Sequence, residues 1–116
     1  MLKDDMVYLG HMLDMAHKAY ENVHGLDREA FDADENLCYA LAHLIKVIGE
    51  AAQRVSPRVR RDLPEIPWHE VTGMRHRIVH DYMNVDDDVI WVVATQDLPE
   101  LIRHPEGFLP PTRGDQ

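Results

Sequence analysis

The sequence predicts an all-α protein, an up-and-down bundle of four main helices with one short extra helical turn in a connector. Apolar residues recur at intervals of three and four along two long segments, which is the spacing of one buried helix face. No segment combines the period-two alternation of a strand with turn residues on both sides. The chain has 116 residues, of which 45% are hydrophobic, and this is enough for one domain with a modest core.

The first two predicted helices are long and amphipathic. The first ends at about His24–Gly25, and its stripe is spaced 4-3-4-3-4-3: Leu2, Met6, Leu9, Leu13, Ala16, Tyr20 and Val23. A polar link, residues 27–34, can hold a short turn of helix, and Asp34 is the expected N-cap of the second helix. The second stripe is spaced 4-3-4-3-4: Leu37, Leu41, Leu44, Ile48, Ala51 and Val55. Ser56–Pro57 should end this helix, because proline lacks the amide proton and clashes with the preceding turn.

The second half of the chain is expected to hold two more helices. Residues 57–67 contain three prolines and predict a connector with one helical turn. The third helix is predicted to start at Trp68 and to run through Tyr82. Acids at 86–88 favour the start of a fourth helix, because the helix dipole favours negative charge there. Residues 104–116 hold three prolines and two glycines and predict a flexible tail, so the domain should span 1–103.

Trp68 and Trp91 are expected to anchor the core, and Cys38 is expected to be a small buried hydrophobe. Because Cys38 is the one cysteine, no intrachain disulfide can form. The first six residues carry two acids and no long apolar run, which argues against a secretory signal. No stretch approaches the length of a membrane span. A soluble, cytoplasmic protein is therefore expected.

The charge of the chain is unevenly distributed. A net charge of −9 argues against a protein that coats nucleic acid. Half of the 12 Lys and Arg residues nevertheless lie between Arg54 and His80, where six arginines accompany three acids. This stretch is either a solvated basic face that balances an acidic one, or a local site for an anion, phosphate or RNA. The candidate RNA-binding and phosphate-binding residues in it are Arg54, Arg58 and Arg77.

A helical wheel of residues 68–82 places Arg75 and Tyr82 within the apolar arc of about 140°. An arginine on a packed face needs an anion or a charged partner. Three interpretations stay open: a buried ion pair, for instance with Glu50, snorkelling of the head group to solvent, or a guanidinium preorganised to hold a phosphate. Tyr82, judged from the wheel alone, is a core aromatic whose hydroxyl is satisfied.

Three histidines, His69, His76 and His80, fall on the opposite side of the same wheel. Such a stripe could bind zinc with one open position for water, but no HExxH pattern or cysteine pair accompanies it. We favour proton transfer near neutral pH as the role of one of them. No metal and no cofactor are therefore predicted.

The stretch Arg75-x4-His80-x-Tyr82 resembles the signature of the HepT-like toxins, a group of the HEPN superfamily that is paired with minimal nucleotidyltransferases. Three further stretches resemble the family in the same order, namely Ile48–Ala51, Pro64–Trp68 and Trp91–Pro99. The resemblance covers about residues 2–103. An isolated Arg-x4-His pattern is weakly specific, and the ordered set is much more so.

The resemblance implies a homodimer with two Arg/His pairs at a cleft between subunits, and metal-independent cleavage of RNA, with tRNA as one candidate substrate. His80 would be the general acid or base, and Arg75 would bind and neutralise the scissile phosphate. His76 stands where the family commonly has a polar residue, often Asn, and is the third catalytic candidate. The protein would be the toxin of a type II-like toxin–antitoxin system.

The antitoxin partner would be a small nucleotidyltransferase that adds adenylyl groups to the tyrosine of the motif, here Tyr82. This modification would place phosphate charge within reach of Arg75 and block the site that RNA needs.

Arg75 and His80 are five positions apart, or about 140° on a regular helix, so one helix cannot point both the same way. The helix could loosen near His80, the arginine could reach around, or a second chain could supply the matching half. We favour a composite site built by two chains. Two other interpretations stay open, a non-catalytic dimeric binding module and a histidine metal site.

Overall fold

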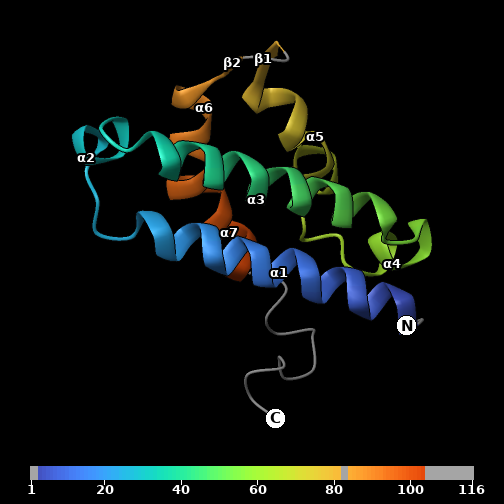
Figure 1. Ribbon diagram of the computed structural model, residues 1–116. Helices are drawn as coiled ribbons and strands as arrows, with labels where there is room; N and C mark the ends of the chain where they lie inside the picture. Colours follow the sequence, from blue (N-terminus) through green and yellow to red (C-terminus); the bar gives the residue numbers. More distant parts are fainter. Residues whose placement is uncertain (1–2, 82–83, 104–116) are drawn as a thin grey trace.

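The computed structural model describes residues 3–81 and 84–103, with backbone alone for Lys3 and for residues 79–81 and 84–85 (Figure 1). It confirms the predicted all-α bundle. The helices are α1 (Lys3–Val23), α2 (Arg28–Asp32), α3 (Glu35–Arg54), α4 (Pro57–Asp62), α5 (Trp68–Ile78), α6 (Asp87–Val92), the π-helical turn η1 (Val93–Asp97) and α7 (Leu98–Arg103). Two short strands, β1 (Val79–Asp81) and β2 (Asn84–Val85), lie between α5 and α6.

The two long helices α1 and α3 form the centre of the bundle and run side by side in opposite directions (Figure 1). α3 also contacts α5, and α1 also contacts α7. Leu9 and Ala16 of α1 and Leu41 and Ile48 of α3 are fully buried, as the two apolar stripes predict. α1 ends at Val23, close to the predicted end, and Gly25, two residues later, has a φ of 84° in the left-handed region.

Side-chain caps define where the helices begin. Asp34 is the N-cap of α3, as predicted, and its Oδ1 accepts a hydrogen bond from the Leu37 amide at 3.0 Å. The expected helical turn in the link before it is α2, whose N-cap is Asp27.

Among the described residues, no helix has the length and apolarity needed to cross a membrane.

A buried carboxylate joins α1 to the end of α3. Asp5 is only 3% exposed, and it accepts hydrogen bonds from the Ser56 amide at 2.8 Å and the Ser56 hydroxyl at 3.0 Å. The Ser56 hydroxyl in turn accepts from the Val59 amide at 3.3 Å and caps α4, the predicted helical turn of the connector. These hydrogen bonds compensate the buried carboxylate of Asp5 for its lost contact with water. The end of α3 directly before Ser56–Pro57 confirms the prediction.

Arg60 satisfies the carbonyl groups at the C-terminus of α3. Its guanidinium donates to the carbonyl oxygens of Ala52, Gln53 and Val55 at 2.8–3.1 Å. The guanidinium of Arg60 therefore has a structural role at the junction between α3 and α4.

Both tryptophans pack, half-buried, against the core, which confirms their predicted role. The Trp68 indole nitrogen donates to the carbonyl oxygens of Arg60 and Leu63 at 3.1 and 3.0 Å. The Trp91 ring lies 5.2 Å from the Phe31 ring, centroid to centroid, and connects α6 to α2.

The predicted extension of the third helix through Tyr82 is wrong, because α5 ends at Ile78. Residues 79–81 and 84–85 form an antiparallel ribbon, in which Val79 pairs with Val85 and Asp81 pairs with Asn84. The β-branched residues of this segment favour extended backbone, and the chain must reverse here to bring α6 back onto α3. The described residues exclude Tyr82, so the prediction for it stays a prediction.

The elements α6, η1 and α7 follow one another without a break and form the last helical rod, which contains a π-helical turn shortly before Pro99. α6 begins at the acids 86–88, as predicted, and Asp86 is its N-cap. Pro99 has no amide proton, and its ring would clash with the Thr95 carbonyl in a regular α-helix. The Leu98 amide bonds to the Val93 carbonyl five residues back, so the wider π turn absorbs this conflict and the rod continues to Arg103. The tail predicted for 104–116 lies outside the described residues.

Cys38 is buried, as predicted, but it is also a hydrogen-bond donor. Its Sγ donates to Asp87 Oδ1 at 2.8 Å, which joins α3 to the first turn of α6. Burial, and then the bond to Asp87, raises the pKa of the Cys38 thiol from its ordinary value of 9.0 to about 12. Folding therefore favours the neutral thiol.

Native protein is expected to react about 10²–10³-fold more slowly with a thiol-modifying disulfide than urea-unfolded chain at the same mildly alkaline pH, because the thiolate is the nucleophile. The folded thiol keeps its proton to higher pH than the unfolded one. This contribution to stability is therefore complete below pH 9 and lost as the pH rises toward 12. Reaction rates and urea unfolding measured across this range test both statements. Equal rates in native and unfolded chain would contradict them.

Candidate active site

The last turn of α5 carries three consecutive basic side chains, Arg75, His76 and Arg77, and all three are exposed. Positive charge at a helix C-terminus is stabilised by the helix dipole. The ribbon that contains His80 begins two residues later. The end of α5 therefore brings the predicted catalytic residues into one region of the molecule.

Arg75 lies beside α3 and pairs with Glu50. Its Nη1 is 3.8 Å from Glu50 Oε1, and the two side chains are 52% and 45% exposed. The expectation that Arg75 lies on a packed face is wrong, because it sits at the rim of the α3–α5 contact. The partner is the one named as an example among the alternatives, but the pair is open to solvent. Exposed ion pairs of this length hold their groups weakly, so the guanidinium can exchange Glu50 for a phosphate.

Gly49 explains how α5 comes so close to α3. A Cβ atom at this position would lie 3.4 Å from the Val71 carbonyl oxygen and 3.6 Å from the Thr72 carbonyl oxygen. The backbone of α5 therefore packs directly against the Cα of Gly49. The neighbouring Ile48 is fully buried and Glu50 reaches Arg75, so the stretch 48–51 both packs α5 and places its arginine.

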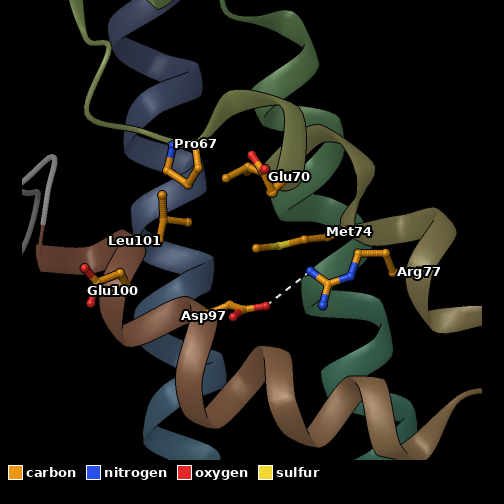
Figure 2. A pocket seen from close by; sticks show the side chains of 8 residues that line it. Pro67, Glu70, Met74, Arg77, Asp97, Glu100 and Leu101 are labelled. Carbon is orange, nitrogen blue, oxygen red and sulfur yellow. Dashed lines mark hydrogen bonds and ion pairs between the residues drawn. The ribbon is translucent and has the colours of Figure 1, made fainter.

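Arg77 points to the other side of α5, where its Nη1 lies 3.2 Å from Asp97 Oδ2 on η1 (Figure 2). The pair lies at a cavity of about 390 Å³ between α5 and the last helical rod. The cavity is lined by Pro67, Glu70, Val71, Met74, Arg77, Asp97, Glu100 and Leu101. Three acids and one arginine line it, so its charge does not favour RNA, and the predicted contact of Arg77 with phosphate would have to compete with Asp97.

Arg54 and Arg58 lie elsewhere. The Arg54 guanidinium stands over the Tyr8 ring of α1, 5.9 Å from its centroid, and Arg58 is exposed on α4. Figure 1 shows α4 at one end of α3 and the β1–β2 ribbon above its middle. The basic stretch predicted from the sequence is thus divided among three places, and it does not form one continuous surface in a single chain.

The histidines are divided as well. His69 and His76 are exposed at opposite ends of α5, and His80 lies on β1. α5 ends two residues before His80, so the wheel does not apply to this residue, and the composite site built by two chains stays a prediction. Over residues 3–81 and 84–103, no three His, Cys, Asp or Glu side chains gather as metal ligands would.

The sequence does not predict Asp86 or Asp97 as residues of the site. Asp97 is the last residue of the π turn, and its pairing with Arg77 depends on a helix register that periodicity does not predict. The sequence predicts Asp86 as an acid at a helix start, but its contact with the end of α5 is tertiary.

Comparison with known proteins matches residues 12–107 to the family described as Ribonuclease HepT-like. A protein of Caldanaerobacter subterraneus, provisionally named an RNase, is 32% identical over 86% of this chain and 89% of its own length. A protein of Methanocaldococcus jannaschii, also provisionally named an RNase, is 26% identical over 90% of this chain and 95% of its own. The probable ribonuclease HepT of Thermococcus cleftensis is 36% identical over 63% of this chain and 66% of its own. No solved structure matches the chain.

Proposed function

Because the chain belongs to the HepT-like ribonuclease family of the HEPN superfamily, we propose that it is an endoribonuclease that cleaves RNA without a metal ion. The observation that carries this proposal is the last turn of α5, where an exposed arginine with a weak partner lies near the histidine of the same motif. The RNA target, with tRNA as one candidate, is part of the proposal.

The proposed reaction needs two kinds of group. RNA supplies its own nucleophile, the 2′-hydroxyl, which attacks the neighbouring phosphorus as the bond to the 5′-oxygen breaks. His80 would take the proton from the 2′-hydroxyl or return a proton to the 5′-oxygen. Arg75 would leave Glu50 and bind the phosphate oxygens, where charge builds up in the transition state. His76, exposed between the two arginines, is the third candidate.

We further propose that the active form is a homodimer, because a second chain can supply the second proton-transfer group. In this form the chain would be the cytoplasmic toxin of a toxin–antitoxin pair. A nucleotidyltransferase antitoxin would add adenylyl groups to Tyr82, and the added phosphate would compete with RNA for Arg75. Co-expression of the chain with such an enzyme, followed by mass spectrometry of the Tyr82 peptide, tests this part separately.

The purified chain is expected to cleave RNA in EDTA, and His80→Ala is expected to lower the rate at least about 100-fold, because general acid–base catalysis contributes that much. His69→Ala is the matched control, since His69 lies on α5 but outside the motif. RNA cleavage by gel electrophoresis is the measurement.

Equal cleavage by the wild-type protein and His80→Ala would contradict the proposal. A wild-type chain that binds RNA but leaves it intact would favour the non-catalytic binding module. The carboxylate partners of Arg75 and Arg77 are an observation in favour of this second candidate.

A further inference from the structure

The acids at the start of α6 hold this helix to the rest of the bundle. Asp87 Oδ1 accepts the hydrogen bond from Cys38 of α3 at 2.8 Å. Asp88 Oδ1 accepts from Arg28 Nη2 of α2 at 2.5 Å. The first turn of α6 is therefore linked to α3 by the hydrogen bond of the buried Cys38 and to α2 by an exposed ion pair.

Asp86, directly before these two, has a different role. Its Oδ1 accepts from the Val89 amide at 3.2 Å and caps α6. Its own amide donates to the Ile78 carbonyl oxygen at 2.6 Å. Ile78 is the last residue of α5, so one residue joins the end of the helix that carries Arg75 to the start of α6.

The segment between these two points, residues 79–85, contains the proposed general acid or base. In the ribbon, Val79 pairs with Val85 and Asp81 pairs with Asn84, so β1 has one residue more than β2 between the two pairs. The extra residue is His80. A bulge bends and twists its strand, and the direction it takes depends on how the ends of the ribbon are held.

We propose that Asp86 is a positioning residue of the ribonuclease: by capping α6 and holding its amide against Ile78, it fixes the ribbon that places His80 beside the end of α5. This inference rests on the proposed function for its catalytic part. Holding the outer ends of β1 and β2 restricts the conformations open to these two strands, and a displacement of about 1 Å can cost 10²-fold in rate.

The test compares two helix caps in the same chain. Asp86→Ala removes the cap of α6, and Asp34→Ala removes an equivalent cap of α3, whose Oδ1 accepts from Leu37 at 3.0 Å. Asp86→Asn and Asp34→Asn keep an acceptor oxygen at each place. Thermal unfolding, kcat and KM for RNA cleavage, and amide hydrogen exchange are measured on all four variants and on the wild-type protein.

Both alanine variants are expected to lower Tm by similar amounts. Asp86→Ala is expected to lower kcat by about 10²-fold with KM within twofold, since Arg75 is unchanged. Asp34→Ala should leave kcat within twofold, and Asp86→Asn should recover most of the loss. Exchange of the residue-86 amide should accelerate at least about tenfold in Asp86→Ala and stay unchanged in Asp34→Ala.

Equal kcat in Asp86→Ala and Asp34→Ala, or an Asp86→Asn variant as slow as Asp86→Ala, would overturn the inference. The exchange measurement does not depend on activity. If the wild-type protein leaves RNA intact while Asp86→Ala still accelerates exchange at residue 86, the proposed function fails and the structural role of Asp86 stands.

Discussion

Arg75→Ala is expected to lower kcat/KM for RNA cleavage by a factor of about 10²–10³, which is the usual cost of removing one group that stabilises the charge of a transition state. Arg75→Lys should recover only a small part of this, because a point charge cannot hold two phosphate oxygens as a planar guanidinium does. Arg75 is 52% exposed and its Glu50 partner is 3.8 Å away, so its removal should leave stability almost unchanged. Steady-state kinetics with a defined RNA and urea unfolding measure the two effects.

Arg77→Ala is the matched control for this prediction. Arg77 lies two residues along the same helix, is also exposed and also has a carboxylate partner, Asp97 at 3.2 Å. Its closer partner and the acids around it predict a loss of less than about fivefold, within the range of weak phosphate contacts. A loss in Arg77→Ala as large as that in Arg75→Ala would contradict the assignment of the phosphate to Arg75.

The second large effect is expected at Gly49. Gly49→Val should lower the free energy of unfolding by about 2–3 kcal/mol, because a branched side chain would press against the backbone of α5. Gly49→Ala should change it by less than about 1 kcal/mol, because the Cβ would lie 3.4 Å from the Val71 carbonyl oxygen and alanine favours the helix. Urea unfolding of both variants is the measurement.

Gly49→Val is also expected to reduce RNA cleavage beyond its loss of folded protein, since α5 carries Arg75. The Gly49→Ala variant serves as the control. If valine were tolerated as well as alanine, the close approach of α5 to α3 would be refuted.

The sequence predicts the parts of this fold that depend on periodicity and on local capping. The two stripes on α1 and α3, the N-cap at Asp34 and the break at Ser56–Pro57 are all set within a few residues of chain. Such features are visible in a sequence because helix geometry repeats every 3.6 residues and proline acts on its immediate neighbours.

The candidate site could be predicted only in part, because its geometry is tertiary. Periodicity predicts a third helix through Tyr82, whereas the bond from the Asp86 amide to the Ile78 carbonyl helps to end this helix at Ile78. The wheel predicts Arg75 on a packed face, whereas the residue lies at the rim of that face, exposed beside Glu50. Neither outcome follows from residues close together in sequence.

Pro99 has a consequence for the way in which the last helix packs. The π turn before it holds one residue more than an α turn, so every later side chain is rotated by about 100° about the axis of the rod. Leu98, Leu101 and Ile102 are buried at this rotation. Pro99, through the π turn before it, thus determines which side of α7 packs against α1.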